Sequence, residues 1–192
     1  MPDYLDFVIR LVIFCCLHSL LATPRIKAGI LAQAAVVHPW YRLIYNLASL
    51  MLFGWVMLAW QSTSVLFVAP GIWSLLLYGL QAATLAAGFI CLKQTGLGAF
   101  LGTEQSCSNT NLPFITSGCY GIVRHPLYLL GILFMLFNPV VTTRWLTLTL
   151  ISILYLLFGA LIEERRMLQQ WGERYRQYQH EVPFLLPRSQ RR

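Results

Sequence analysis

Long apolar runs constrain this chain more than any other feature of its sequence. Several of them approach 20 residues, the length at which a helix crosses the hydrocarbon core of a bilayer. Of the 192 residues, 57% are hydrophobic and 11% are charged, whereas about a quarter of the residues in a soluble domain are charged. The composition therefore predicts one compact domain, residues 1–192, embedded in a membrane.

The apolar runs predict an all-α, polytopic fold with about five transmembrane helices. These segments cover about residues 4–22, 43–60, 72–92, 126–138 and 141–162. Pro126 suits the first turn of the fourth segment, which is short for a span and forms a helical hairpin with the fifth segment. Residues 163–180 place apolar and charged side chains on different faces, which predicts a C-terminal amphipathic helix. The largely apolar face carries Glu164, Leu168, Trp171, Tyr175 and Tyr178.

Basic residues are spread unevenly along the chain, whose formal net charge is +7. With five spans, the loops at 23–42 and 93–125 share a side with the C-terminal tail, and together they hold most of the Lys and Arg. Because cytoplasmic loops are enriched in these residues, we expect a multi-pass protein of a bacterial or archaeal inner membrane with a cytoplasmic C-terminus. The basic tail would face anionic membrane lipids. Nucleic-acid binding is disfavoured because the basic end is short.

The cysteines give no sign of a metal site. Neither a C-x-x-C pair nor the usual spacing of zinc ligands is present, so we expect no metal. The number of cysteines is odd, and free thiols in a reducing compartment are the favoured interpretation. The five residues are Cys15, Cys16, Cys91, Cys107 and Cys119.

Two polar clusters stand at the ends of apolar segments. The first, residues 117–131, reads S-G-C-Y-G-I-V-R-H-P-L-Y-L-L-G, and the second, residues 163–166, reads E-E-R-R. An unpaired charge in hydrocarbon costs several kcal/mol, so we expect the clusters to meet at the membrane surface. Together they would bind a zwitterion, with an Arg or a backbone N–H on its carboxylate and a Glu on its ammonium. Alternatively, Arg-His anchors headgroups and Glu-Glu-Arg-Arg is a solvated helix face.

Two further positions carry weaker signals. Tyr128 and Gly131 are three residues apart, so they share a helix face, and Gly131 would leave room for a flat ligand. His18 lies in the first apolar segment, where its ordinary role is a hydrogen bond to a neighbouring helix.

The pattern G-x-Y-x-x-x-R-H-P-x-Y-x-x-G at 118–131, followed by E-E-R-x-M-L-x-x-W-G-x-x-Y-x-x-Y-x-x-x-V-P at 163–183, resembles the signature of the isoprenylcysteine carboxyl methyltransferase family of membrane enzymes. Phospholipid N-methyltransferases are more distant relatives of that family. The first two segments, with His18-Ser19 and Tyr41-Arg42-x-x-Tyr45-Asn46, are similar to the NnrU-like and thiol-methylating branch.

This resemblance implies S-adenosylmethionine as the methyl donor. It divides the chain into an N-terminal three-helix membrane part with a cytoplasmic loop, 1–116, and a cofactor-binding part, 117–187. Arg124 and Arg165 or Arg166 would orient an acidic substrate group, and His125 or His18 would deprotonate a thiol; the catalytic candidates are Arg124, His125 and Arg166. The residues implied to line the cofactor pocket are Tyr120, His125, Pro126, Tyr128, Gly131, Glu163 and Glu164.

The expected function is methyl transfer to a membrane-associated acceptor. The carboxylate of a prenylated cysteine is the favoured acceptor, and another lipidic group, a small thiol or a lipid amine remains open. One alternative is a non-catalytic membrane protein that keeps the fold for assembly or sensing. A small transporter is disfavoured because segments two to five carry no ionisable residue at mid-bilayer depth.

Overall fold

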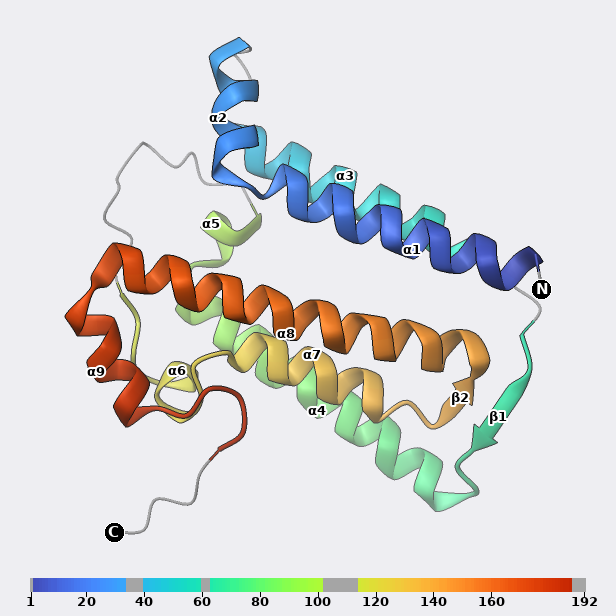
Figure 1. The fold of residues 1–192 in the computed structure, drawn as a ribbon. Coiled ribbons are helices and arrows are strands. Elements are labelled where there is room, and N and C mark those ends of the chain that lie inside the picture. The colour runs from blue at the N-terminus through green and yellow to red at the C-terminus, as the bar shows by residue number, and fades with distance from the viewer. Residues whose placement is uncertain (1, 34–39, 60–62, 102–113, 188–192) are drawn as a thin grey trace, which may run out of the picture. The chain divides into compact units, whose positions relative to one another are not determined.

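The structure is a computed structural model that describes residues 2–33, 40–59, 63–101 and 114–187 (Figure 1). The fold is mostly helical, as expected. In chain order its elements are α1 (Pro2–Leu21), α2 (Pro24–Gln33), α3 (Tyr41–Met57), β1 (Val65–Val68), α4 (Ile72–Gln94), α5 (Leu97–Leu101), α6 (Cys119–Ile122), α7 (Pro126–Leu136), β2 (Val140–Thr142), α8 (Thr143–Trp171) and α9 (Glu173–Glu181).

The expectation of an all-α fold misses one small sheet. Strands β1 and β2 pair antiparallel, with Val65 opposite Thr142 and Val68 opposite Val140. Both strands are rich in β-branched residues, which fit a pleated surface better than a helix. The sheet joins the chain before α4 to the connection between α7 and α8.

In the described part of the chain, three helices are long and apolar enough to cross a membrane. They cover Asp3–Leu21, Ile72–Gln94 and Thr143–Trp171. Helix α3 has 17 residues and α7 has 11, so five spans are not confirmed. The three long helices support an integral membrane protein, and the side on which the C-terminus lies stays a prediction.

The chain divides into two compact units. The first unit comprises Met1–Thr63 and Gly96–Leu112, and the second comprises Ser64–Thr95 and Pro113–Arg192. Helix α4, which the sequence interpretation grouped with the N-terminal part, packs against α7 in the second unit. A functional division near residue 116 stays a prediction.

In the first unit, polar side chains join α1 to α3. His18 Nδ1 lies 2.9 Å from Ser49 Oγ, and Tyr45 Oη lies 2.8 Å from His18 Nε2. The ordinary interpretation of His18, a hydrogen bond to a neighbouring helix, is therefore confirmed. Near the other end of α1, Arg10 pairs with Asp6 at 2.9 Å within the same helix.

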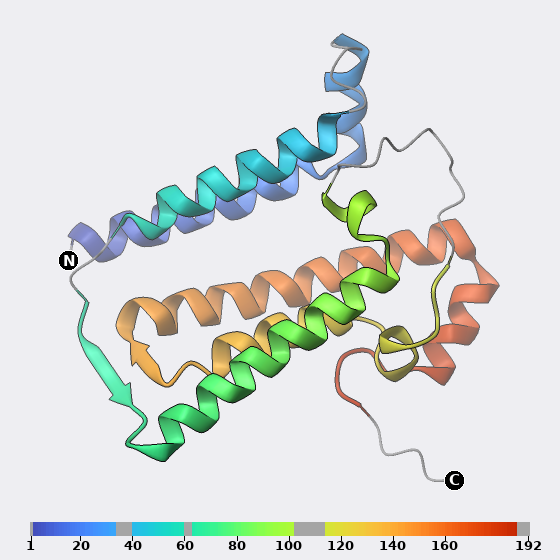
Figure 2. The same cartoon turned by 180° about the vertical axis from the view of Figure 1, so that it is seen from behind.

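In the second unit, the short helix α7 packs beside both α4 and α8 (Figures 1 and 2). Gln81 Nε2 of α4 donates to the Phe134 carbonyl at 2.9 Å, and Trp145 Nε1 of α8 donates to the Met135 carbonyl at 2.9 Å. The last four carbonyls of a helix lack intrahelical donors, and an unsatisfied carbonyl in an apolar environment is costly. These two side chains therefore satisfy carbonyls in the last turn of α7, so the helix can end where it packs against α4 and α8.

The C-terminal amphipathic helix differs from its expected form. Helix α8 continues through Glu163 to Trp171, and α9 starts only at Glu173. Gly172 separates them with a φ of +54°, a conformation that glycine adopts without steric cost. The chain therefore turns at Gly172, and α9 packs back against α8.

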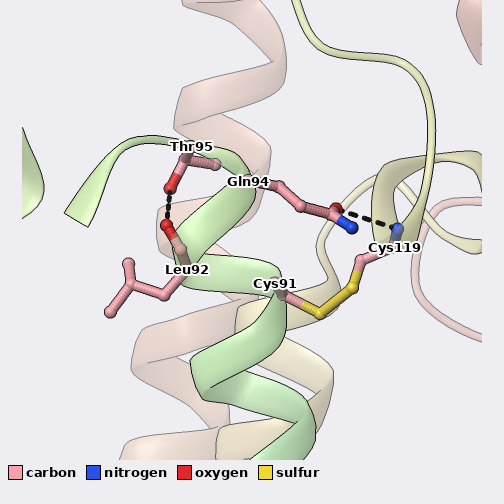
Figure 3. Close-up of a disulfide and its surroundings, with 5 residues drawn as sticks. All are labelled: Cys91, Leu92, Gln94, Thr95 and Cys119. Carbon is pink, nitrogen blue, oxygen red and sulfur yellow. Dashed lines mark hydrogen bonds between the residues drawn. A yellow bond between two sulfur atoms is a disulfide. The ribbon is translucent and has the colours of Figure 1, made fainter.

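A disulfide joins Cys91 of α4 to Cys119 of α6, with their Cα atoms 5.7 Å apart (Figure 3). The prediction of free thiols is wrong for this pair, because residues 28 positions apart in the sequence meet only through the packing of α4 against the α6–α7 segment. Gln94 Oε1 accepts a hydrogen bond from the Cys119 backbone N–H at 3.1 Å. Cys15 and Cys16 are free, whereas Cys107 lies outside the described residues.

Replacing Gly118 with Ala is expected to destabilise the second unit. Gly118 has a φ of +63°, and a Cβ there would collide with the side-chain amide of Gln94, which binds the Cys119 N–H. We expect a loss of about 2 kcal/mol, from left-handed backbone strain and a lost hydrogen bond, in thermal unfolding of the detergent-solubilised protein.

Gly71→Ala is the matched control for this change. Gly71 also has a positive φ, +50°, but nothing lies within 4 Å of a Cβ built there. Only the backbone cost, about 1 kcal/mol, is expected. Equal losses in the two variants would contradict the contact between residue 118 and Gln94.

Candidate functional site

The connection between α6 and α7 positions the first polar cluster. Pro126 is the first residue of α7, and it disfavours a helical conformation for the residue before it; His125 has φ −123° and ψ 62°. The Arg124 backbone N–H donates to the Pro183 carbonyl at 2.9 Å. The chain that follows α9 therefore lies against this connection, which puts the side chains of Arg124 and His125 near α8 and α9.

The Glu164 carboxylate of α8 is the centre of the site and is only 7% exposed. It accepts from Arg124 Nε at 2.9 Å and Nη2 at 3.2 Å, from His125 Nε2 at 2.9 Å and from Tyr175 Oη at 2.7 Å. Gln179 Nε2 is a further donor. The two polar clusters therefore meet, as expected, and their position at the membrane surface stays a prediction.

The Arg124 guanidinium makes several hydrogen bonds to other groups of the protein. Its two bonds to Glu164 form a bidentate pair, and its Nη1 donates to the carbonyls of Gln179 at 3.0 Å and Val182 at 2.6 Å. A buried ion pair offsets its desolvation cost only when such additional hydrogen bonds satisfy both charges. Arg124 thereby attaches α9 and the chain after it to α8.

Glu163, the neighbour of Glu164, has a different environment. Its carboxylate is half-exposed and accepts from Tyr128 Oη at 3.0 Å. Its Oε2 lies 3.8 Å from His125 Nδ1, which is too far for a hydrogen bond. Successive residues of a helix point about 100° apart, so one carboxylate is enclosed by the protein while the other keeps an accessible oxygen.

The His125 imidazole is oriented by its neighbours. A carboxylate only accepts hydrogen bonds, so Nε2 carries the proton that binds Glu164, and in the neutral ring Nδ1 holds a lone pair. The ring stacks on Tyr128 with centroids 5.5 Å apart and meets Phe184 edge-on at 5.0 Å. This pattern, a base held by a carboxylate, is the one that activates nucleophiles in many enzymes.

Two tyrosines of α9 act as donors in the cluster, and the backbone of Tyr120 in α6 is an acceptor. Tyr178 Oη donates to the Tyr120 carbonyl at 2.6 Å. Burial raises the pKa of Tyr178 to about 12, and burial with the nearby Glu163 charge raises the pKa of Tyr120 to about 12. Burial and the hydrogen bond to Glu164 also raise the pKa of Tyr175. The three phenols therefore stay protonated at neutral pH.

An aromatic cluster packs under α9. The rings of Trp171, Tyr175 and Tyr178 surround Phe114, with centroids 5.4, 5.7 and 5.3 Å away. The predicted apolar face of the C-terminal helix contained the first three residues, and this packing confirms it. Phe114 carried no signal in the sequence, because it stands in a polar loop stretch.

The remaining candidate residues lie around this centre. Pro126 is buried at the start of α7. A Cβ on Gly131 would only touch Leu156 of α8 at 3.9 Å, an ordinary contact, so helix packing does not require glycine there. Arg165 and Arg166 are exposed on α8, away from the buried Glu164 carboxylate.

Sequence reasoning missed three contributions to the site. Gln179 donates to Glu164, Phe184 packs against His125, and the carbonyls of Val182 and Pro183 bind Arg124. The V-P pair at the end of the second motif was the available signal for the last contribution. Within the described ranges, no group of three or more His, Cys, Asp or Glu could hold a metal ion, and the absence of a metal stays a prediction.

Comparison with known proteins finds relatives over part of the chain. It is 38% identical over 78 residues to methanethiol S-methyltransferase of Pseudomonas deceptionensis, covering 41% of this chain and 30% of the relative. It is 35% identical over 78 residues to the enzyme of that name from Crocosphaera subtropica, covering 41% and 31%. It is 37% identical over 90 residues to methanethiol S-methyltransferase 2 of Bradyrhizobium diazoefficiens, covering 47% and 33%.

The chain thus spans about a third of the length of these relatives. No family model matches, and no solved structure matches. The similarity to proteins named as methyltransferases agrees with the expected resemblance in general. The relatives' names support its thiol-methylating branch, and they give no support to specificity for isoprenylcysteine.

Replacing Glu164 by Gln is expected to destabilise the protein strongly. The variant keeps the shape of the side chain but leaves the Arg124 charge, 10% exposed, without its ion pair. Removing one partner of a buried pair costs roughly 3 kcal/mol or more. Thermal unfolding in detergent measures this loss.

Glu163→Gln, at the adjacent half-exposed carboxylate, is the control and should cost less than about 1 kcal/mol. If the two variants unfold at the same temperature, Glu164 is not the centre of the cluster.

Proposed function

We propose that this chain binds S-adenosylmethionine and transfers its methyl group to a small thiol at the membrane. The observation that carries the proposal is that two adjacent carboxylates have different environments. Glu164 is saturated by internal donors, whereas Glu163 is half-exposed beside Tyr128 and the Nδ1 atom of His125. The names of the relatives support methyl transfer and a thiol acceptor.

The chemistry of the donor set fits this cofactor. S-adenosylmethionine carries an ammonium and a sulfonium, both positive, and Glu163 offers a partly exposed carboxylate that can pair with the ammonium. The aromatic face of Tyr128 suits a cation. Of the two glutamates, Glu163 is therefore the proposed cofactor contact, and Glu164 positions the residues around it. Tyr120, Pro126 and Gly131 stay candidates for the lining.

Arg124 is proposed as a positioning residue. All of its described hydrogen bonds go to Glu164, to carbonyls of the chain around α9 and, from its backbone, to Pro183. A thiol acceptor has no carboxylate, so the expected role of Arg124 or Arg166 in orienting an acidic acceptor is not needed for this reaction.

The bound cofactor would supply an electrophilic methyl group on its sulfonium. The protein's task is then to deliver a thiolate, because the thiolate rather than the thiol is the nucleophile. His125 Nδ1 is the proposed base that takes the thiol proton. Glu164, bonded to Nε2, orients the ring and stabilises the imidazolium that forms. Phe184 packs edge-on against the ring and helps to exclude water.

The carboxylate of a prenylated cysteine is the less favoured acceptor. A carboxylate is already ionised at neutral pH and needs no base, so an oriented histidine would have no task in its methylation. A non-catalytic protein that keeps the fold for assembly or sensing is the second candidate, and it predicts no methyl transfer to any acceptor.

Titration of S-adenosylhomocysteine into the purified protein tests the cofactor contact. We expect Glu163→Gln to weaken binding about tenfold or more, because a charged hydrogen bond to the ammonium is lost. The control is Glu173→Gln, which changes a more exposed acid on α9 that pairs with Arg176. Unchanged affinity in Glu163→Gln, with the wild type binding, would exclude Glu163 as the contact.

The pH dependence of thiol methylation tests the base. His125→Gln keeps a donor for Glu164 but loses the basic ring nitrogen Nδ1, so we expect kcat to fall about 100-fold at pH 7. The defect should shrink as the pH rises, because the solution then supplies thiolate directly. Thioether formation from methanethiol measures both effects. A defect of the same size at every pH would assign His125 a purely structural role.

A further inference from the structure

We propose that the disulfide between Cys91 and Cys119 is a redox switch for the candidate site. In its oxidised form it fixes α6 on α4 and favours cofactor binding, and reduction to the dithiol releases α6 and weakens binding. The inference rests on the proposed function, since the property under control is the affinity for the cofactor.

Helix α6 is one turn long and is held from two sides. On one side, the disulfide and the Gln94 side chain attach Cys119 to α4 (Figure 3). On the other, Tyr178 of α9 donates to the carbonyl of Tyr120, the residue after Cys119. An isolated helical turn is unstable by itself, so these attachments determine where α6 lies.

The attachment lies directly beside the site in the chain. Only residues 120–123 separate Cys119 from Arg124, and Val123 is the one extended residue between α6 and Arg124. Helices α6 and α9 lie at the end of the second unit where α4 has its C-terminus (Figures 1 and 2). Loss of the bond to α4 would therefore loosen Tyr120 and the start of the motif.

The expected membrane topology favours a switch over a permanent link. The basic loop at 93–125, which contains Cys119, is predicted to face the cytoplasm, where thiols are kept reduced. Disulfides in that compartment are usually transient and serve in catalysis or redox sensing. A disulfide that forms there, beside a binding site, responds to the ratio of small-molecule thiol to its disulfide in the cell.

Thiol–disulfide exchange provides a balanced reaction for the switch. A small-molecule thiolate attacks the sulfur of Cys119, which is half-buried, whereas Cys91 is 2% exposed. The Cys91 thiolate leaves and takes a proton. A second thiolate attacks the small molecule's sulfur in the mixed disulfide, which forms a small-molecule disulfide and releases the Cys119 thiolate, and this thiolate takes a proton. Two electrons pass to the protein, and a small-molecule disulfide reverses the reaction.

The proposed methyl acceptor belongs to the same class as this reductant. A small thiol in excess would reduce Cys91–Cys119 by the same exchange and so lower the affinity for the cofactor. The switch would then limit methylation when the thiol pool is large relative to its disulfide.

Calorimetric titration of S-adenosylhomocysteine into the full chain tests the proposal without adding a thiol acceptor. We expect the oxidised protein to bind about tenfold more tightly than protein reduced with a phosphine, a typical size for coupling between two sites. The double variant Cys91→Ser/Cys119→Ser should bind like the reduced protein, and the reductant should not change its affinity. The control Cys15→Ser/Cys16→Ser changes the free thiols of α1 and should behave like the wild type.

Equal binding in the two redox states would overturn the proposal. If mass spectrometry shows the disulfide intact in one sample and reduced in the other, and both bind equally, the bond is a link without a regulatory effect. If neither sample binds, the proposed function fails, and amide hydrogen exchange of residues 119–123 tests the switch separately. Faster exchange after reduction supports release of α6, and unchanged exchange contradicts it.

Discussion

The arrangement of the second unit depends on one buried carboxylate. Glu164 stands where the apolar part of α8 ends, and an unpaired charge at such a place would be costly. Its donors come from the α6–α7 connection and from α9. Satisfying this charge therefore requires that α9 fold back at Gly172 and that the chain after α9 lie against Arg124. The same contacts orient His125 and leave Glu163 facing outward.

The features that local sequence determines were predictable. Helix α4 was expected at about 72–92 and is found at 72–94, because a long apolar run has few alternatives in a membrane. Pro126 set the start of α7, and the spacing of aromatic residues identified the buried face of the C-terminal helix. The need of Arg124 and His125 for partners predicted that they would meet the Glu-Glu pair.

The features that depend on contacts between distant segments were not predictable. Cys91 and Cys119 come together through the packing of α4, and β1 pairs with β2 across more than 70 residues. Glu163 and Glu164 differ in the direction of their side chains. The sequence Glu-Glu does not show which of the two points into the protein. Gly172 carried the signal for the break between α8 and α9, but an uninterrupted amphipathic pattern concealed it.

Amide hydrogen exchange of residues 173–183 tests most directly whether Glu164 organises the site. The measurement compares the wild type with Glu164→Gln and with Glu163→Gln, all without ligand. If Glu164 holds α9 in place, exchange across 173–183 accelerates by about tenfold or more in Glu164→Gln and stays near the wild-type rate in Glu163→Gln. Equally slow exchange in Glu164→Gln would contradict the account, because α9 would then be held by its aromatic packing alone.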